Sequence, residues 1–466
     1  MRWLAAAFLW IALLCLSGCG VSWSSQQPAR PWSTGFWFWQ GSSAREAWSR
    51  EPVDVLFVEV GTIREPARPG LRRPTGIEKS PWYIYGTWPR DVPEAKEYWF
   101  VFRYENQGVP DVEVAPKLAQ EVSRLWGETK NANLRVAGVQ LDIDSPTSDL
   151  PRYASFLHEF KKGLPQGCQT SITALLDWFR SGTAIGQVIQ EVDEFVPQFY
   201  DINTSSDYPT GEISIAARID AARWGPVFNR FGKRFRIGIS SFGRARMVRN
   251  KSDTQSRYPE IRFFGDLKPI DLATNPIFEL QTTRNQANEL VLTYRAQRKY
   301  RIGYTDFAPG QSIEFILATP ESVRAAAGSV REMKGNLEGV LFFRWPSDQE
   351  ALAMQPEEVL LAAGLGGKAA GRERNHISVV DGHCAAVECV DIYLEGSAPF
   401  SPKPVRYRIH SSKELEYFLP EKNLPIQMSG ASELDLSLPP YCARGRLYLG
   451  RAVTRNHSEF TVEEAQ

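Results

Sequence analysis

Short apolar runs alternate along the chain with segments of helical periodicity. The runs are rich in β-branched and aromatic residues, which is typical of strands buried in a core. They span residues 35–39, 53–60, 98–104, 135–143, 168–175, 192–200, 234–242 and 339–345. Helical spacing is clearest at residues 111–128, 149–164, 320–335 and 356–367. Eight strands with intervening helices predict an α/β fold of the (β/α)8 TIM-barrel type. An open doubly wound sheet is the alternative, but the sequence has no glycine-rich phosphate-binding fingerprint to support it.

Two regions do not follow this repeat. The segment at about 245–319 separates the seventh strand from the next helical segment and contains strand-like stretches of its own, so we expect a small β-rich insertion there. Residues 368–466 are also strand-like, which predicts a separate C-terminal β-sandwich-like domain. The barrel and its insertion are therefore expected to occupy residues 34–367.

The first residues have the pattern of an export signal. Arg2 precedes an apolar run from residue 4 to residue 16, which is too short to span a bilayer comfortably. The stretch from Leu16 to Cys19 resembles a bacterial lipobox, and this resemblance implies a lipoprotein signal peptide at 1–18, cleavage before Cys19 and lipidation of Cys19. An ordinary signal peptide with a chance cysteine is the alternative. Residues 19–33 then form a polar tether, and Gly20 favours the outer membrane, facing the periplasm, as the site of the anchor.

Composition narrows the classes of partner and cofactor. The chain has 54 Lys and Arg residues and 54 Asp and Glu residues, so its formal net charge is zero. A chain without excess positive charge has no basic field that would attract nucleic acid. The five histidines form no HExxH motif and no cluster at a strand end, so we expect no metal site and no cofactor. The sequence does not indicate an oligomeric state.

Four cysteines remain beyond the signal and the lipidated residue. We expect Cys168, on a barrel strand, to stay free, because the other three lie together in the last quarter of the chain. A hairpin bend between Cys384 and Cys389 would allow those two to pair. If they lie on one straight strand, either of them could pair with Cys442 instead.

The fourth apolar run ends in two aspartates, Asp142 and Asp144. Side chains alternate along a strand, so Gln140, Asp142 and Asp144 share the face that looks into the barrel, at the end where active sites of this fold collect. Two close carboxylates raise each other's proton affinity, and one can then act as a general acid near neutral pH. The alternative is structural, with Asp144 bonding backbone amides in a turn ahead of Pro146.

Four stretches in the right order resemble one enzyme family. Residues 137–144, "AGVQLDID", resemble the signature of the family 18 glycoside hydrolases, the chitinase-like group. The stretches at 197–201, 237–245 and 338–345 are similar to that family's sixth, seventh and eighth strands. The overall resemblance is to a family of bacterial envelope proteins with a domain-of-unknown-function label, which shares the "QLDID-PTS-L--Y" and "SITAL--W" stretches.

The chitinase-like resemblance implies residue roles. Asp144 takes the place of the proton donor, Asp142 and Tyr200 orient the substrate's own N-acetyl group as the nucleophile, and Asp201 supports them; the mechanism would be substrate-assisted and retaining. Three departures stand against this reading, because Ala137 and Gln140 replace signature aspartates and Asp144 replaces a glutamate.

Other residues are candidate sugar contacts. Aromatic faces suit the C–H surfaces of sugars, although they fill cores equally well. The candidates are the inward-facing Trp37, Trp39, Trp345 and Gln140, the residues Asp177 and Trp178 after the fifth strand, Gln198 in the sixth strand, and Arg244 at the rim. Trp345 shares its face with Phe343, which is the alternative occupant of the place under the sugar. Together these features predict a glycoside hydrolase-like lipoprotein acting on an envelope glycan or exopolysaccharide. The alternative is an inactive barrel that binds glycan or an envelope protein.

Overall fold

The computed structural model of the chain describes residues 32–39, 42, 53–65, 82–106, 108–200, 219–249, 260–264, 267–273, 275–347, 350, 352–365, 375–385, 387–396, 404–421, 424, 426–438 and 445–465. The predicted signal peptide and Cys19, the predicted lipidation site, lie outside these residues, as do Asp201 and Cys442. Within the described ranges, no helix has both the length and the apolar character needed to cross a membrane.

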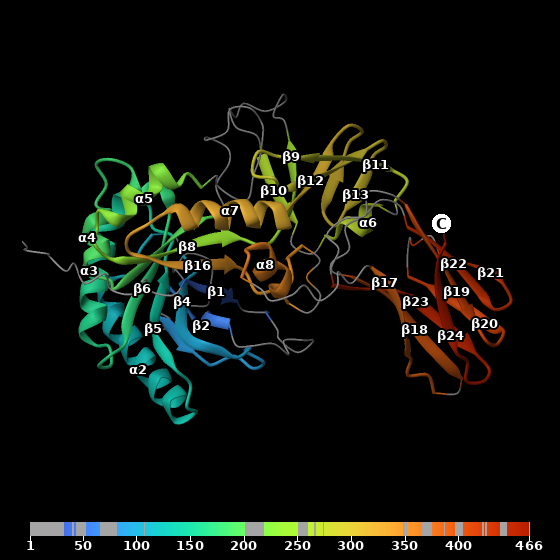
Figure 1. Ribbon diagram of the computed structural model, residues 1–466, viewed down its shortest axis with the longest axis horizontal. Coiled ribbons are helices and arrows are strands. Elements are labelled where there is room, and N and C mark those ends of the chain that lie inside the picture. The colour runs from blue at the N-terminus through green and yellow to red at the C-terminus, as the bar shows by residue number, and fades with distance from the viewer. Residues whose placement is uncertain are drawn as a thin grey trace, which may run out of the picture. The chain divides into compact units, whose positions relative to one another are not determined.

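Eight parallel strands form a closed barrel (Figure 1). In chain order they are β1 (Ser33–Phe38), β2 (Val53–Arg64), β4 (Ala95–Tyr104), β5 (Val136–Asp142), β6 (Gln169–Ala174), β7 (Glu194–Phe199), β8 (Arg234–Ser240) and β16 (Leu337–Phe343). Each strand pairs with the next around the ring, and β1 pairs with both β2 and β16, which closes the sheet. The short strand β3 (Tyr83–Gly86) adds an antiparallel neighbour to β2. The predicted barrel and its eight strands are confirmed.

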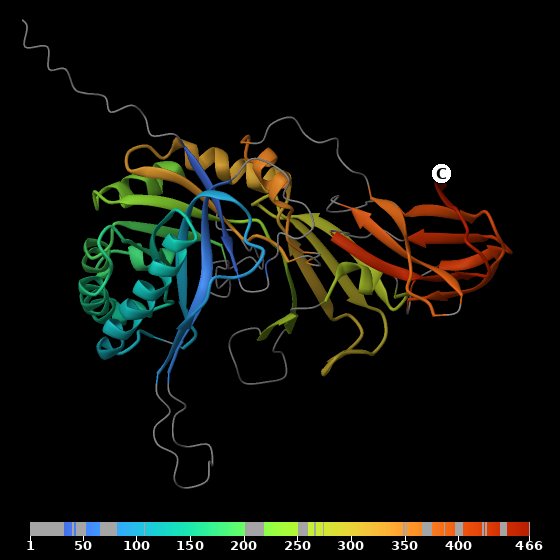
Figure 2. The ribbon, with the colours of Figure 1, turned by 90° about the horizontal axis from the view of Figure 1, so that it is seen from below.

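Among the described residues, helices follow the barrel strands from β4 onwards and pack on the outside of the barrel (Figures 1 and 2). The α-helices are α2 (Ala115–Asn131), α3 (Leu150–Lys162), α4 (Ile185–Gln190), α5 (Ala221–Asn229), α7 (Pro320–Glu332) and α8 (Pro356–Ala362). Short 3-10 turns lie at η1 (Val112–Val114), η2 (Thr147–Asp149) and η3 (Leu176–Phe179). A proline stands in the first turn of α2, α3, α7 and α8, where the missing backbone N–H has no helical partner to lose. The helices predicted at 111–128, 149–164, 320–335 and 356–367 are confirmed.

A second sheet is inserted between β8 and α7. Its antiparallel strands run in the order β10-β9-β15-β12-β11, and a small hairpin of β13 and β14 stands beside it. The elements are β9 (Arg244–Arg249), β10 (Glu260–Phe264), α6 (Pro269–Ala273), β11 (Phe278–Arg284), β12 (Leu290–Ala296), β13 (Tyr300–Ile302), β14 (Thr305–Phe307) and β15 (Ser312–Leu317). One face of this sheet packs into an apolar core that includes Leu292, Tyr294 and Phe315. The predicted β-rich insertion is confirmed.

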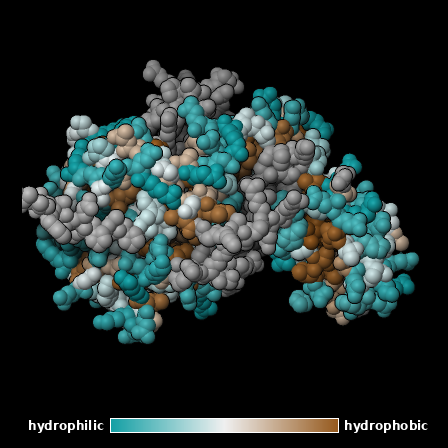
Figure 3. All heavy atoms as spheres, viewed as in Figure 1, coloured by the Kyte–Doolittle hydropathy of each residue, from teal (hydrophilic) through white to brown (hydrophobic). Residues whose placement is uncertain are grey.

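The C-terminal residues form two four-stranded sheets. One has the order β17-β18-β23-β20 and the other β21-β22-β19-β24. The strands are β17 (His376–Asp381), β18 (Glu388–Gly396), β19 (Val405–Ser411), β20 (Leu415–Pro420), β21 (Ile426–Gly430), β22 (Glu433–Leu438), β23 (Gly445–Thr454) and β24 (Phe460–Ala465). Both sheets contribute to one core, with Ile392 and Leu449 from the first and Ile409 and Leu436 from the second. This is the predicted β-sandwich, and an apolar patch is visible on its surface (Figure 3).

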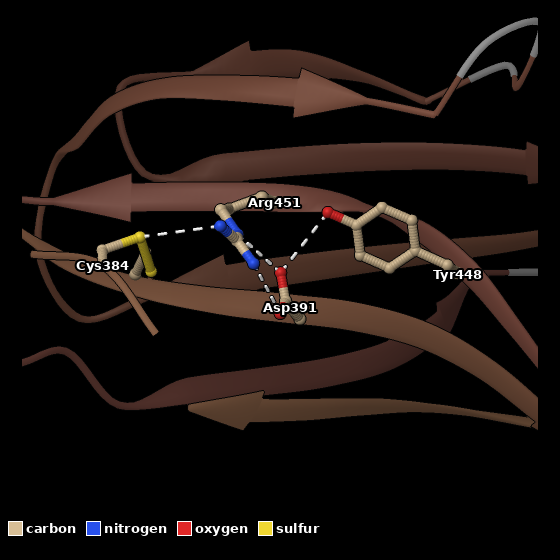
Figure 4. The surroundings of a disulfide bond; sticks show 5 residues. Cys384, Asp391, Tyr448 and Arg451 are labelled. Atoms are coloured by element: carbon tan, nitrogen blue, oxygen red, sulfur yellow. Dashed lines mark hydrogen bonds and ion pairs between the residues drawn. A yellow bond between two sulfur atoms is a disulfide. The ribbon is translucent and has the colours of Figure 1, made fainter. Parts of the chain in front are cut away.

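A disulfide joins Cys384 to Cys389 (Figure 4). Strand β17 ends at Asp381 and β18 begins at Glu388, so the chain turns between them and brings the two cysteines together. Of the alternatives that the sequence left open, the short pairing is the one that forms. Cys168 is free, as predicted. Arg451 donates to Cys384 Sγ at 3.8 Å and binds Asp391 with two nitrogens, which ties the turn to strand β23.

Large aromatic side chains fill the middle of the barrel. Trp37 and Trp99 are fully buried, and glycines on other barrel strands make room for them. A Cβ atom on Gly238 would lie 2.9 Å from ring atoms of both Trp37 and Tyr200, and one on Gly138 would lie 2.8 Å from the ring of Trp99. The interior is therefore a packed core.

A buried ion pair lies at the amino end of the barrel. Glu194 begins β7 and is bound by the guanidinium of Arg236 on β8, and both side chains are buried. Arg236 also donates to Ser33 Oγ at 3.2 Å.

Removing one partner of this pair should destabilise the barrel. A single substitution leaves a buried charge, which typically costs about 3–5 kcal/mol, whereas replacing both partners by apolar residues is often neutral. We expect Glu194→Leu to lower the free energy of unfolding by about 3 kcal/mol, and adding Arg236→Met to restore most of it. Urea unfolding followed by tryptophan fluorescence measures this, because the insertion and residues 368–466 contain no tryptophan.

The matched control is Glu159→Leu, which breaks the exposed pair between Glu159 and Lys162 on α3 and should leave the midpoint nearly unchanged. A Glu194→Leu protein as stable as the unsubstituted chain would contradict the prediction.

Candidate functional site

Asp142 is the last residue of β5 and points into the carboxyl end of the barrel. It is 9% exposed. Thr173, on the neighbouring strand β6, donates its hydroxyl to Asp142 Oδ1 at 2.7 Å. On the other side, Arg103 of β4 is the register partner of Asp142, and its Nε lies 3.9 Å from Oδ2. The carboxyl is therefore held from both sides by neighbouring strands.

The pKa of Asp142 is raised. Burial is the main cause, because the charged form loses its hydration, and the charge of Glu59 adds to it. The hydrogen bond from Thr173 and the charge of Arg103 act in the opposite direction but do not outweigh burial. Sequence reasoning missed Glu59, Arg103 and Thr173. The two-residue period of β2, β4 and β6 places all three on the inner face, but only strand register shows that they surround Asp142.

Asp142 and Asp144 are not equivalent. Because β5 ends at Asp142, the alternation of the strand does not extend to Asp144, which is exposed. The carboxyl whose charge adds to the raised pKa of Asp142 is Glu59. The mutual effect of Asp142 and Asp144 on their proton affinity stays a prediction.

The charges of both aspartates act on the hydroxyl group of Tyr153. This residue of α3 is fully buried, and its hydroxyl has no hydrogen-bond partner among the described residues. Its pKa is raised well above the ordinary value by burial and then by the charges of Asp142 and Asp144. Both carboxylates therefore lie within electrostatic reach of one hydroxyl group. The helical spacing showed that Tyr153 is buried, but not what its hydroxyl faces.

Tyr200 belongs to an aromatic cluster at the same end of the barrel. It follows β7 and is buried. Its ring stacks on Phe343 with centroids 4.7 Å apart, and it meets Trp37 edge-on at 5.6 Å. Phe343 also contacts Phe242 at 5.2 Å. Asp201, the predicted supporting residue, lies outside the described residues.

Trp37 and Gln140 lie deeper in the barrel and are hydrogen-bonded to each other. The indole N–H of Trp37 donates to Gln140 Oε1 at 2.7 Å, and Gln140 Nε2 donates to Ser171 Oγ at 3.1 Å. Both side chains are fully buried. Neither therefore presents an exposed surface in this structure, and their roles as sugar contacts stay predictions.

Trp178 is also a core residue. The 3-10 turn η3 directs its ring inwards, where it is fully buried, meets Tyr153 edge-on at 6.0 Å and donates its N–H to the Ser145 carbonyl at 2.9 Å. The indole is buried here, so the role of Trp178 as a sugar platform stays a prediction. The neighbouring Asp177 is half-buried and accepts a hydrogen bond from Thr147 at 3.5 Å.

Trp345 does not face the barrel axis. Strand β16 ends at Phe343, so the two-residue alternation stops there and Trp345 turns to the other side. Its ring packs against Phe36 and Phe38, with centroids 5.4 and 6.4 Å away. The alternative given by the sequence holds, because Phe343 takes the inward position.

Three predicted contacts keep some exposed surface. Trp39 is half-buried, with the guanidinium of Arg103 lying 5.7 Å from its ring centroid. Gln198 on β7 is half-buried as well. Arg244 begins β9 in the insertion, and its guanidinium lies 5.4 Å from the ring of Phe242. Their roles in sugar binding remain predictions. Among the described side chains, no group of three or more His, Cys, Asp or Glu residues is placed to hold a metal ion.

Residues 100–303 match the family described as Domain of unknown function (DUF3142). The match begins within β4 and ends just after β13, so it contains Arg103, Asp142, Asp144 and Tyr200. The resemblance to a domain of unknown function that the sequence predicted is confirmed. No curated protein matches the chain.

Several solved structures are similar to this chain. The C-terminal domain of a candidate chitinase from Desulfitobacterium hafniense DCB-2 is 14% identical with a TM-score of 0.44, and the match covers 72% of this chain and 98% of that one. A spore cortex-lytic enzyme from Bacillus cereus is 12% identical with a TM-score of 0.44, over 72% of this chain and 74% of that one. A GH18 chitinase from Cycas revoluta in complex with (GlcNAc)3 is 13% identical with a TM-score of 0.36, over 58% and 81%.

The raised pKa of Asp142 should appear in the stability of the barrel. A carboxyl whose pKa is higher in the folded state than its ordinary value of 3.8 stabilises the fold below that value and loses this contribution as the pH rises through the folded pKa. We therefore expect Asp142→Asn to gain stability relative to the unsubstituted chain as the pH rises above about 4. Urea midpoints by tryptophan fluorescence at several pH values measure this.

Asp54 on β2 provides a control of opposite sign. Burial raises its pKa, but bonds from Lys96 and Thr34 outweigh this and leave the pKa lowered. Asp54→Asn should therefore lose stability relative to the unsubstituted chain at neutral pH, and the loss should disappear as the pH falls through the folded pKa of Asp54. If Asp142→Asn and Asp54→Asn show the same sign, the assignment for Asp142 is wrong.

Proposed function

We propose that this protein is a divergent glycoside hydrolase-like barrel that cleaves a cell-envelope glycan or exopolysaccharide. The observation that carries the proposal is the pairing of two unlike carboxyls at the end of β5. Asp142 is buried, bonded to Thr173 and has a raised pKa, whereas Asp144 is exposed two residues later. An arrangement of this kind separates a positioning group from a group that meets the substrate.

Asp144 is the proposed proton donor. Cleavage of a glycosidic bond requires a proton on the leaving oxygen while positive charge develops on the sugar ring. An exposed carboxyl at the barrel rim can reach that oxygen, and a buried one already bonded to Thr173 cannot. Asp142, in the proposal, receives and orients the substrate's N-acetyl group, with Tyr200 as its neighbour at the barrel end.

The proposed location follows from the lipobox resemblance. We infer that the mature protein begins at Cys19 and is held in the bacterial envelope by lipid on that residue, at the outer membrane facing the periplasm. In cells of the source organism, Cys19→Ser should move the protein from the membrane fraction to the soluble envelope fraction, and it should no longer incorporate labelled palmitate. A Cys19→Ser protein that still carries the label rules out this anchor.

A second candidate function is binding without cleavage. It is favoured by the filling of the barrel end, where Tyr200 stacks on Phe343 and packs against Trp37. Gln140, which stands in the place of a signature aspartate, is bonded to Trp37 and Ser171. A barrel of this kind would bind glycan through its rim and leave the bond intact.

The role of Asp144 can be tested with substrates of different leaving groups. We expect Asp144→Asn to reduce kcat/KM on natural glycan fragments by at least about a hundredfold, since general acid catalysis contributes about 10²–10⁴-fold. On a dinitrophenyl glycoside of the same sugar, whose leaving group needs no proton, the loss should be small. The measurement is a panel of N-acetylhexosamine oligomers, peptidoglycan strands and exopolysaccharides, with product release followed by mass spectrometry.

Asp381→Asn, an exposed aspartate at the end of β17 in the sandwich, is the control and should leave both rates unchanged. Equal losses on both substrates would show that Asp144 is not the acid. Binding to a glycan with no product from any of them would favour the second candidate function.

A further inference from the structure

The longest barrel strand continues past the rim of the barrel. Strand β2 pairs with β3 at its carboxyl end, through Gly61 with Gly86, Thr62 with Tyr85 and Arg64 with Tyr83. The two strands form a ribbon that projects from the barrel (Figure 2). Because β2 is parallel to the strands that follow it, this ribbon extends from the same end of the barrel as Asp142.

One row of residues crosses four neighbouring strands from the ribbon to Asp142. Tyr85 of β3 pairs with Thr62 of β2, Thr62 pairs with Arg103 of β4, and Arg103 pairs with Asp142 of β5. Strands in a sheet lie about 4.8 Å apart, so Tyr85 and Arg103 are separated by about 10 Å. The row is continuous with the proposed site.

The row lies on the inner face of the sheet. Cβ atoms built on Gly61 and Gly86 would approach the ring of Phe102 at 2.9 and 3.0 Å, and Gly86 would also meet Leu125 of helix α2 at 2.7 Å. These glycines therefore face the helices. Their neighbours along the strands, Thr62 and Tyr85, face the opposite side, as Arg103 does next to Phe102.

Two tyrosine rings on the ribbon are open to solvent. Tyr83 is 52% exposed and Tyr85 54% exposed, and they share one face because they are two residues apart. The guanidinium of Arg64 lies 6.0 Å from the ring centroid of Tyr83, and that of Arg124 lies 5.8 Å from Tyr85. These arginines are engaged with carboxylates, Arg64 with Glu105 and Arg124 with Glu121. The rings thus offer apolar faces within a polar surround.

Arg103 differs from the other two arginines. Its side chain is 46% exposed, and within the described residues it makes no hydrogen bond to a carboxylate. The nearest acidic oxygen, Asp142 Oδ2, is 3.9 Å from Nε, beyond hydrogen-bond distance. The ring of Trp39 lies 5.7 Å away and helps to fix the guanidinium. Among the described residues no hydrogen bond from the Arg103 guanidinium is found, and its N–H donors form a fork that suits a carboxylate.

We propose that Arg103 and the inner face of the β2–β3 ribbon form a binding subsite for a glycan chain that carries carboxylates. The proposal rests on the proposed function and names its substrate class. Arg103 receives the carboxylate of one sugar unit, while Tyr85 and Tyr83 receive the C–H faces of units further along the chain. Glu59 and Asp142 lie on the inner side of Arg103, and Asp144 is exposed after β5. These carboxylates would repel an acidic substituent of the glycan, so Arg103 is the position where such a substituent fits.

The test is a binding experiment on the full mature chain. Two sources of carboxylate are compared, peptidoglycan glycan strands with their lactyl ethers and a uronic acid polysaccharide, each beside its carboxyl-reduced form. Dissociation constants come from affinity electrophoresis for the polysaccharide and from calorimetry for the strands. We expect reduction of the carboxyls to weaken binding of one source by about tenfold to a hundredfold, as for a charge-assisted hydrogen bond.

Variants separate the charge from the aromatic surface. Arg103→Gln should bind the native and the reduced form equally weakly, and Arg103→Lys should recover part of the preference. Tyr85→Ala should weaken both forms by a similar factor. The control is Arg408→Gln in the sandwich, where the arginine is 51% exposed and should not affect binding. Thermal midpoints of each variant confirm that the barrel is folded.

The outcomes distinguish this inference from the proposed function. Cleavage of glycans without preference for carboxylates overturns the inference and leaves the hydrolase proposal standing. A carboxylate preference that depends on Arg103, with no cleavage of any glycan, supports the inference and overturns the hydrolase proposal. A preference that survives in Arg103→Gln, or no binding to any of the four glycans, overturns the inference.

Discussion

Closure of the parallel sheet is the constraint on which the rest of the structure depends. Because β1 pairs with both β2 and β16, every barrel strand has one face towards the axis and one towards the helices. The interior is narrow, so its inward residues must fill it without voids. Trp37 and Trp99 do this, and Gly238 and Gly138 give them space. Closure therefore decides which polar side chains are buried, and a buried polar group needs a partner.

The polar groups inside the barrel find their partners at three levels along the barrel axis. At the amino end Arg236 binds Glu194, and in the middle Gln140 is bonded on both sides. At the carboxyl end Asp142 has Thr173 as its hydrogen-bond donor and Arg103 only at a longer distance. The groups around Asp142 thus come from neighbouring strands that the barrel holds in register.

The sequence predicts the barrel because each strand is an apolar run and each helix an amphipathic one. It fails where an inference extends beyond the end of an element. Asp144 and Trp345 lie two residues past the last residues of β5 and β16, and alternation no longer applies to them. Trp178 turns inwards through a 3-10 turn that no periodicity indicates. The neighbours of Asp142 could not be identified either, because Glu59, Arg103 and Thr173 come from three other strands and only the register aligns them.

Asp142 and Asp144 differ in burial, and this difference bears on the replacement of the signature glutamate by Asp144. A proton donor must meet its substrate, and a group that orients the substrate must not move. Burial and the bond from Thr173 fix Asp142, and its raised pKa follows from the same burial. The exposed Asp144 has the access that Asp142 lacks, although its side chain is one methylene shorter than that of glutamate. A misplacement of about 1 Å can cost about a hundredfold in rate. A substrate held closer to the rim would compensate for the shorter reach, and Arg103 and the tyrosines of the ribbon lie where such a hold is needed.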